Sequence, residues 1–286
     1  AEALPGRPTA LLLGTAPAGG KLPPSWRAVV FDAINAGLDV RSGLHTFLGD
    51  DPEFAAAANA AAVTIVDYRR PPERMEVSSG RVHRPGKKVI LTVGTDCALG
   101  KMSVALELRK SAVDAGLPAV FVPTGQTGMM IDGWGVAVDR VISDFINGTC
   151  EWLVEQAEAM GDWIFVEGQG SLDHPAYSAV TLGLIHGCTP QAMVMVHQAG
   201  RTHHHGWEGS EQTLKPLPEF IRLHEEVAGL VAPSKVVCVA LNTGLLAEDE
   251  ARREIARTAE ETGLPTDDPY RFGGDRLLDA IRERMA

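Results

Sequence analysis

The stretch that decides the fold is Val89-Ile-Leu-Thr-Val-Gly94-Thr-Asp-Cys-Ala-Leu-Gly100-Lys101-Met102-Ser103. An apolar run leads into a loop bounded by glycines, and a lysine then opens a stretch with helical spacing. Glycines let the backbone approach a ligand closely, while the loop amides, the helix N-terminus and the lysine attract an anion. The stretch therefore predicts a phosphate-binding loop made of Gly94, Thr95, Asp96, Cys97, Gly100, Lys101, Met102 and Ser103.

Two details of this loop depart from the usual G-x4-G-K-[ST] spacing. Five residues lie between Gly94 and Gly100, which resembles the loops of dethiobiotin-synthetase-like enzymes. Met102 stands where a hydroxyl normally offers its oxygen to Mg²⁺, and a thioether is a poor ligand for that hard cation. The loop thus predicts bound phosphates but disfavours metal-dependent phosphoryl transfer. Coenzyme A, whose phosphates serve only for binding and are not transferred, fits this loop as well as a nucleotide does.

The composition around the loop limits the kind of protein. At about 150 residues per domain, 286 residues predict roughly two domains. The charges, 26 Lys+Arg against 37 Asp+Glu, give a net charge of −11, which argues against partners such as nucleic acids or anionic membranes. No apolar run approaches the ~18 residues that span a bilayer. The four cysteines lack CxxC spacing, so we expect a cytoplasmic protein without disulfides or a zinc site.

Apolar runs alternate with helical stretches along the whole chain, which predicts an α/β fold with a mostly parallel, helix-flanked sheet. The polar, basic segment 78–88 marks a boundary between a small α/β domain, residues 1–86, and a larger domain, residues 87–286. In the larger domain we expect strands at Lys88–Val93, Ala119–Pro123, Trp163–Val166, Ala192–Val196 and Lys235–Leu241. Helices are expected at Lys101–Ala115, Val136–Met160 and Ala247–Thr262. Loops that follow parallel strands meet at one edge of the sheet, so these loops should converge.

Candidate catalytic residues follow these strands. Glu167 comes directly after an apolar strand, where a carboxylate can act as a general base; the alternative is a solvated or capping residue. His174, seven residues later, is a second candidate base or a structural histidine. Asp96, within the phosphate loop, is a third candidate.

Candidate substrate-binding residues are more scattered. Gln126 and Thr127 lie in Thr124–Gly128, which either orients a substrate or is only a turn. Arg201 suits bidentate recognition of a carboxylate. The remaining candidates are Gln169, Arg69 and His45. Three consecutive histidines, His203 to His205, follow Arg201, but neighbours on a loop rarely converge on one ion, so we predict no metal site.

Several of these motifs together resemble the DUF1611 family. They are Val93–Met102, Thr124–Gly128, Val166–Leu172 with His174-Pro175, Asp139–Phe145, Gly43–His45 and Asp267–Pro269. The likeness runs from about Leu13 to Pro269. Family members usually have a further strand and helix at the N-terminus, so this chain is expected to begin inside that domain. Asp173 and Thr202–Trp207 are less typical of the family.

The resemblance implies a Rossmann-like N-terminal domain and a P-loop C-terminal domain. It also implies D-glutamate N-acetyltransferase activity with acetyl-CoA as co-substrate, alongside an N-acetyl-amino-acid racemase. The leading hypothesis is thus an amino-acid N-acetyltransferase in which Glu167 or His174 is the base and Arg201 and Arg69 hold the acceptor. An ATP- and Mg-dependent ligase or kinase is the alternative, and a nucleotide sensor without turnover is the third. A homo-oligomer is the general expectation for such enzymes.

Overall fold

The computed structural model describes residues 8–15, 17, 20–73 and 75–285. The start of the predicted N-terminal domain, residues 1–7, lies outside them. The chain divides into two compact units. The first comprises the described residues up to Glu73 together with Gly125–Arg140, and the second comprises those of 74–124 and 141–286. A segment from the middle of the chain therefore belongs to the N-terminal unit.

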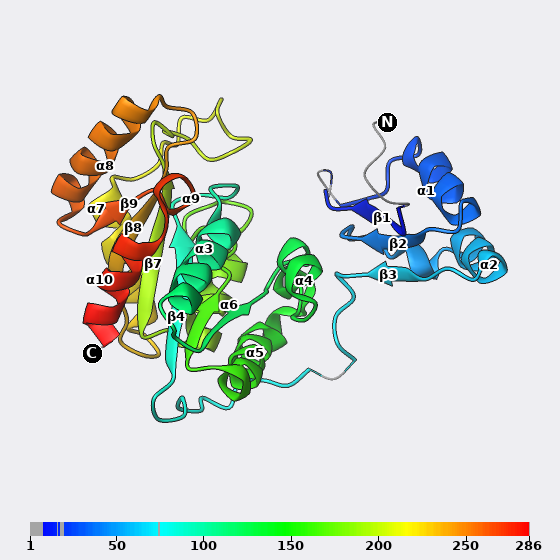
Figure 1. Cartoon of the computed structure of the whole chain (residues 1–286), viewed down its shortest axis with the longest axis horizontal. Coiled ribbons are helices and arrows are strands. Elements are labelled where there is room, and N and C mark those ends of the chain that lie inside the picture. The colour runs from blue at the N-terminus through cyan, green and yellow to red at the C-terminus, as the bar shows by residue number, and fades with distance from the viewer. Residues whose placement is uncertain (1–7, 16, 18–19, 74, 286) are drawn as a thin grey trace. The chain divides into compact units, whose positions relative to one another are not determined.

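The first unit is built on a small parallel sheet of β1 (Ala10–Leu13), β2 (Asp39–Ser42) and β3 (Ile65–Asp67), in that order. Helices α1 (Trp26–Asn35) and α2 (Pro52–Ala61) pack against each other (Figure 1). The Asp51 carboxylate accepts hydrogen bonds from the N–H groups of Glu53 and Phe54, at 3.0 and 3.3 Å, and caps α2. Phe54 is fully buried in the core of the unit.

The inserted segment contains helix α4 (Gln126–Asp132) and a 3-10 turn at Val138–Arg140. One expectation is wrong here: no helix spans Val136–Met160. Of the two alternatives for Thr124–Gly128, it is not only a turn, because it leads into α4. Helix α5 begins only at Ile146, because Ile142 is extended (ψ 135°) and the chain passes from one unit to the other after Arg140. The apolar residues that imitate a helical period, Val136–Val138, are buried outside that helix.

The second unit is a six-stranded sheet in which every paired neighbour is parallel, as expected. The order is β5-β6-β4-β7-β8-β9. The strands are β4 (Lys88–Gly94), β5 (Ala119–Val122), β6 (Trp163–Val166), β7 (Ala192–Gln198), β8 (Lys235–Asn242) and β9 (Thr266–Asp267). Each predicted strand is present within two residues of its expected ends.

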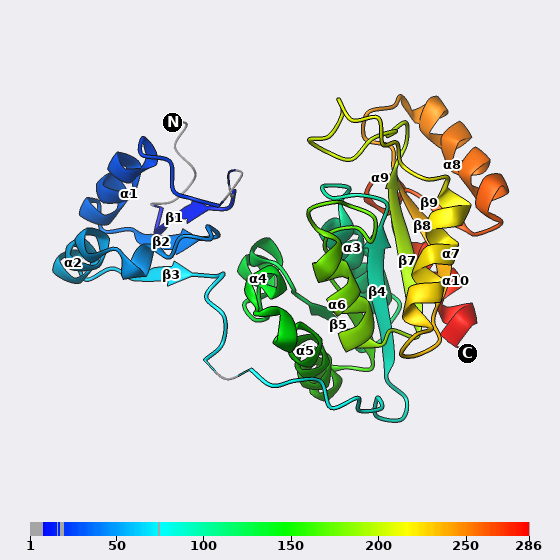
Figure 2. The same cartoon turned by 180° about the vertical axis from the view of Figure 1, so that it is seen from behind.

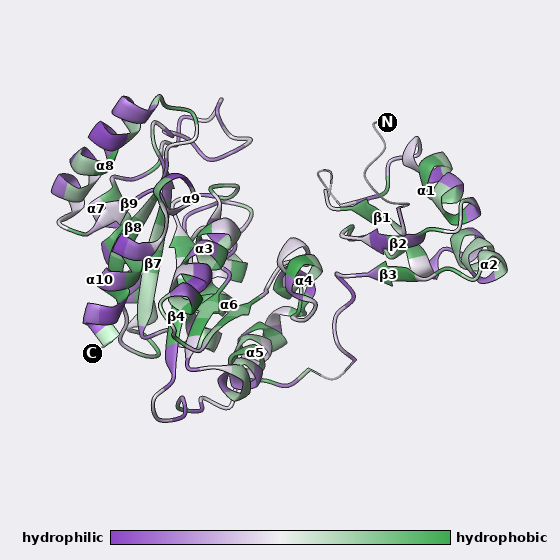
Figure 3. Cartoon of the chain, in the orientation of Figure 1, coloured by the Kyte–Doolittle hydropathy of each residue, from purple (hydrophilic) through white to green (hydrophobic). Residues whose placement is uncertain are grey.

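Helices cover both faces of this sheet. On one face lie α3 (Lys101–Asp114) and α10 (Asp275–Met285); on the other lie α5 (Ile146–Met160), α6 (Ser178–Cys188) and α7 (Leu217–Ala228) (Figures 1 and 2). Helix α8 (Glu248–Thr262) packs on α7 and β9, and α9 (Pro269–Phe272) on α3. Figure 3 shows apolar strands beneath helices with hydrophilic outer sides, such as α8 and α10. Among the described residues, no helix has both the length and the apolarity that crossing a bilayer requires.

Candidate functional site

The phosphate loop has the predicted order of strand, glycine-bounded loop and helix. Strand β4 ends at Gly94, where a Cβ atom would lie 3.1 Å from the Val196 carbonyl and 3.3 Å from Lys101 Cδ. Gly100, the residue before α3, has a φ of 103°, which side-chain-bearing residues rarely adopt. The close contacts at Gly94 and the positive φ of Gly100 therefore favour glycine at both ends of the loop. Met102 and Ser103 lie half-buried in the first turn of α3.

Lys101 is buried beneath the loop, and its Nζ donates to the Asp96 carbonyl oxygen at 2.6 Å. Burial lowers the pKa of Lys101 to about 8, although the electrostatic interactions with Cys97, Asp96 and Glu167 act to raise it. The ammonium therefore remains mostly charged at neutral pH and sits where a phosphate-binding lysine is needed. Burial also raises the pKa of the Cys97 thiol, although Lys101 opposes the rise, so this cysteine is not a thiolate.

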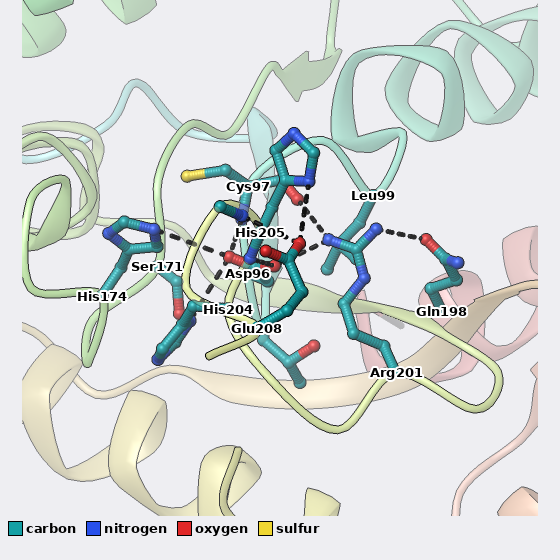
Figure 4. A network of polar contacts seen from close by, with 12 residues as sticks. Asp96, Cys97, Leu99, Ser171, His174, Gln198, Arg201, His204, His205 and Glu208 are labelled. Atoms are coloured by element: carbon teal, nitrogen blue, oxygen red, sulfur yellow. Dashed lines mark hydrogen bonds and ion pairs between the residues drawn. The ribbon is translucent and has the colours of Figure 1, made fainter. Parts of the chain in front are cut away.

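The carboxylate of Asp96 is fully buried and accepts hydrogen bonds on both oxygens (Figure 4). Oδ1 accepts from the Cys97 N–H at 2.6 Å and faces His204 Nδ1 at 3.3 Å. Oδ2 accepts from Arg201 Nη1 and the His205 N–H, both at 2.7 Å. Burial alone would raise the pKa of Asp96, but these bonds, first that of Arg201, hold it below its usual value. The loop thus contains an ionised carboxylate.

Two histidines meet at this carboxylate. His174 Nε2 lies 3.8 Å from Asp96 Oδ1, and the His174 and His204 ring centroids are 4.8 Å apart. Both side chains are 1% exposed. Burial, followed by the charge of His204, lowers the pKa of His174. Of the three consecutive histidines, only His204 contacts Asp96 through its ring among the contacts of the described residues, while His205 does so through its backbone N–H. The role of His204 went unpredicted because nothing in the run distinguishes it from its neighbours.

Glu167 stands at the end of β6, on the same edge of the sheet. Its Oε2 accepts from the Thr124 N–H at 2.9 Å, and its own carbonyl accepts from Thr124 Oγ1 at 2.8 Å. Gln169 Nε2 donates to Thr124 Oγ1 at 3.1 Å. Gly168 approaches β4 so closely that a Cβ would lie 1.6 Å from the Thr92 carbonyl oxygen. The expected convergence of the strand-end loops is therefore confirmed for β4, β5 and β6.

Arg201 also joins this edge, from the loop after β7. Besides Asp96, it contacts the Cys97 carbonyl through Nη1 at 3.2 Å and Gln198 Oε1 through Nη2 at 2.6 Å. Its guanidinium is therefore engaged within the unit. His197, at the end of β7, contacts Thr95 Oγ1 through Nδ1 at 2.8 Å, and burial followed by the charge of Arg201 lowers its pKa to about 4.

Three further predicted residues meet in the first unit, around Arg69. This side chain donates from Nε to the Gly43 carbonyl and from Nη2 to Gln126 Oε1, both at 2.7 Å, and pairs through Nη1 with Asp139. His45 Nε2 lies 3.6 Å from Asp139 Oδ2. Sequence reasoning did not single out Asp139, although it opens one of the motifs quoted above. Thr127 is half-buried in α4 beside Gln126.

Comparison with known proteins agrees with this architecture. The Rossmann-like N-terminal domain model of DUF1611 matches residues 1–71, and its P-loop domain model, described as a domain of unknown function, matches residues 76–278. A crystal structure of a DUF1611 family protein from Anabaena variabilis superposes with a TM-score of 0.90 at 42% identity, covering 97% of this chain and 80% of that one.

Two curated relatives carry the name D-glutamate N-acetyltransferase. The protein from Tritonibacter scottomollicae is 39% identical over 95% of this chain and 80% of its own length. The protein from a Pseudoalteromonas species is 37% identical over 93% of this chain and 79% of its own.

Proposed function

The chain belongs to the DUF1611 family, and on that basis we propose that it N-acetylates an amino acid, with acetyl-CoA as donor and D-glutamate or a related amino acid as acceptor. Two relatives named D-glutamate N-acetyltransferase, each matching more than nine-tenths of the chain, support amino-acid N-acetylation. The choice of acetyl-CoA as the donor rests on one observation, the phosphate loop. In this loop a buried lysine is followed by Met102, where a Mg²⁺-binding hydroxyl would usually stand.

In this proposal the loop holds the phosphates of coenzyme A as an anchor. The loop amides and the N-terminus of α3 supply partial positive charge, and the Lys101 ammonium supplies a full one. Lys101 exchanges its contact with the Asp96 carbonyl for a phosphate oxygen when the donor binds. No phosphoryl group is transferred, so the reaction does not need a Mg²⁺-binding hydroxyl after Lys101.

Acetyl transfer requires a base, since the acceptor nitrogen is an ammonium at neutral pH. Glu167 is our preferred base because its buried carboxylate lies on the same edge as the loop, near Lys101; His174 is the second candidate. The base takes a proton, and the freed amine bonds to the thioester carbonyl carbon. Backbone N–H groups stabilise the resulting oxyanion. The carbon–sulfur bond then breaks, and coenzyme A leaves as the thiol after gaining a proton.

The acceptor carboxylates need cationic partners. Arg201 and Arg69 are the candidates from sequence, and both have internal partners in the structure. Each guanidinium carries five N–H donors, of which these contacts use three, so two donors remain for a ligand. We propose Arg201 as the first of the two, because it belongs to the same unit as the phosphate loop. Gln169, in the same unit, joins Arg201 in the proposed acceptor set, whereas Gln126, Thr127 and His45, in the first unit, stay predictions from the sequence.

The test is release of coenzyme A thiol from acetyl-CoA in the presence of single amino acids, with D- and L-glutamate compared first. We expect release with D-glutamate, and a Lys101→Ala variant should lose about 10- to 100-fold at low acetyl-CoA, since a charge-assisted hydrogen bond contributes about 1.5–3 kcal/mol. Lys110→Ala, an exposed lysine on the same helix, is the matched control and should behave as the unmodified protein.

The same samples distinguish the alternative, an ATP- and Mg-dependent ligase or kinase. Amino-acid-dependent release of ADP, without thiol release from acetyl-CoA, would replace the acetyltransferase proposal with that one. Tight calorimetric binding of Mg-ATP with no binding of coenzyme A would have the same meaning.

A further inference from the structure

Three polar atoms beside the phosphate loop are buried and have no hydrogen-bond partner among the described residues. They are His174 Nε2, His204 Nε2 and Asp173 Oδ2. Buried polar atoms are nearly always satisfied, by protein, water or a bound ion. Of the three, His174 Nε2 faces the Asp96 carboxylate, 3.8 Å from Oδ1, and therefore points to a ligand bound between them.

We propose that Asp96, His174 and His204 bind a divalent transition-metal cation. One donor atom from each of the three residues lies within 4.8 Å of those of the other two. Asp96 Oδ1 is 3.3 Å from His204 Nδ1 and 3.8 Å from His174 Nε2. Ligands placed about 2.0–2.2 Å from a tetrahedral ion lie roughly 3.3 Å apart, so small side-chain movements complete the site (Figure 4).

The donor set selects the class of cation. Two imidazoles and one carboxylate suit Zn²⁺, Co²⁺ or Ni²⁺, whereas Mg²⁺ and Ca²⁺ prefer oxygen ligands alone. Three protein ligands leave a fourth tetrahedral position for water or another small ligand. The site therefore differs from the Mg²⁺ site that usually accompanies a phosphate-binding loop.

Neighbouring groups orient two of the ligands. Arg201 Nη1 and the His205 N–H hold Asp96 Oδ2, which leaves Oδ1 directed at the histidines. Asp173 Oδ1 lies 3.5 Å from His204 Nε2 without a hydrogen bond between them, and a small approach would let it accept the proton of a ring that binds metal through Nδ1. Such a carboxylate behind a ligating histidine is a common outer partner in metal sites.

The third ligand has to adjust. In the structure the Ala176 N–H donates to His174 Nδ1 at 3.1 Å, so a neutral His174 ring carries its proton on Nε2. Metal binding at Nε2 moves that proton to Nδ1 and turns the Ala176 amide away. Bound metal also removes His174 as a candidate base, which leaves Glu167 in that role.

The three ligands come from the loops after β4, β6 and β7, so the ion links segments that are far apart in the sequence. Binding to the folded chain should therefore raise its unfolding temperature. The cation site and the acetyl-transfer proposal are independent, because metal binding is measured without donor or acceptor.

The experiment is a titration of tag-free, full-length protein with Zn²⁺ in competition with a chromophoric chelator, followed by the absorption spectrum with Co²⁺. We expect one equivalent of either ion, a tetrahedral Co²⁺ spectrum and a higher unfolding temperature. His204→Gln and His174→Gln should weaken Zn²⁺ binding at least about tenfold. His203→Gln and His205→Gln are matched controls with unchanged binding, since the His205 ring is 63% exposed and only its backbone meets Asp96.

Two results would overturn the site: Zn²⁺ binding that persists unchanged in His204→Gln, or no stoichiometric binding of Zn²⁺ or Co²⁺ to the unmodified protein. Circular dichroism checks that each variant is folded. If the variants do not fold, the Co²⁺ spectrum of the unmodified protein tests the site instead. Lys101→Ala should retain the metal while losing acetyl transfer, so the two proposals can fail separately.

Discussion

Two buried clusters, one in each unit, pair an arginine with a carboxylate but differ in which partner is central. In the first unit Arg69 is central, and it donates to a carbonyl, an amide and the Asp139 carboxylate. In the second unit the Asp96 carboxylate is central, surrounded by N–H donors, by His204 Nδ1 and by His174 Nε2, which has no hydrogen-bond partner among the described residues. The first cluster joins the inserted segment, Gly125–Arg140, to the rest of its unit, whereas the second contains groups that can bind a ligand. The two clusters differ in the buried atoms left without a hydrogen bond among the described residues: Asp139 Oδ1 in the first, and His174 Nε2, His204 Nε2 and Asp173 Oδ2 around the second.

Removing Asp96 should have the largest effect on stability. Asp96→Ala leaves the Arg201 guanidinium and two backbone N–H groups without their buried acceptor. We expect unfolding free energy to fall by about 3–5 kcal/mol, measured by urea unfolding with circular dichroism. Asp114→Ala, at the exposed end of α3, is the control and should change it by less than about 0.5 kcal/mol. A similar small loss in both variants would mean that the Asp96 network is not stabilising.

Arg69→Met should lower the free energy of unfolding by less, about 2 kcal/mol. The Asp139 side chain is 22% exposed, so it is hydrated by water when its arginine partner is lost. The same urea experiment measures it. Arg70→Met, at the neighbouring half-exposed arginine, provides the comparison. If Arg69→Met proved more harmful than Asp96→Ala, the Arg69 cluster would be the more tightly coupled of the two.

The pH dependence of donor binding should follow Lys101. Its pKa of about 8 in the free protein means that the ammonium is lost above that pH, and phosphate binding requires the charged form. The dissociation constant for coenzyme A should therefore be nearly constant below pH 7 and rise above pH 8, approaching tenfold per pH unit. Lys101→Arg, which stays charged, should not show this rise. A pH-independent constant in the unmodified protein would exclude Lys101 as the phosphate ligand.

The smallest effect is expected away from both clusters. Asp51→Ala removes the cap of α2 and should lower unfolding free energy by about 1 kcal/mol, measured as above. Asp51→Ser restores a capping oxygen and should recover most of the loss. Equal destabilisation by alanine and serine would assign the effect to the ion pair of Asp51 with Arg27 instead.

The sequence predicted what depends on local pattern. Val89–Ser103 has the periodicity and the glycines of a strand, a loop and a helix, so the phosphate loop could be predicted. Residues after parallel strands meet at one edge of the sheet, so the position of Glu167 near this loop could be predicted as well. What escaped depends on contacts between distant residues. Asp139 is 70 residues from Arg69, and only their pairing reveals why residues 125–140 join the first unit. His204 lies between two other histidines, and only the fold shows which one turns toward Asp96.

The excursion of Gly125–Arg140 has a practical consequence for dissecting the molecule. Because the chain enters the N-terminal unit twice, a gene split at any one point cannot separate the two units from each other. A fragment that stops at the basic linker would lack α4 and the carboxylate partner of Arg69. Shuffling these units between relatives would therefore require exchanging two separate segments together.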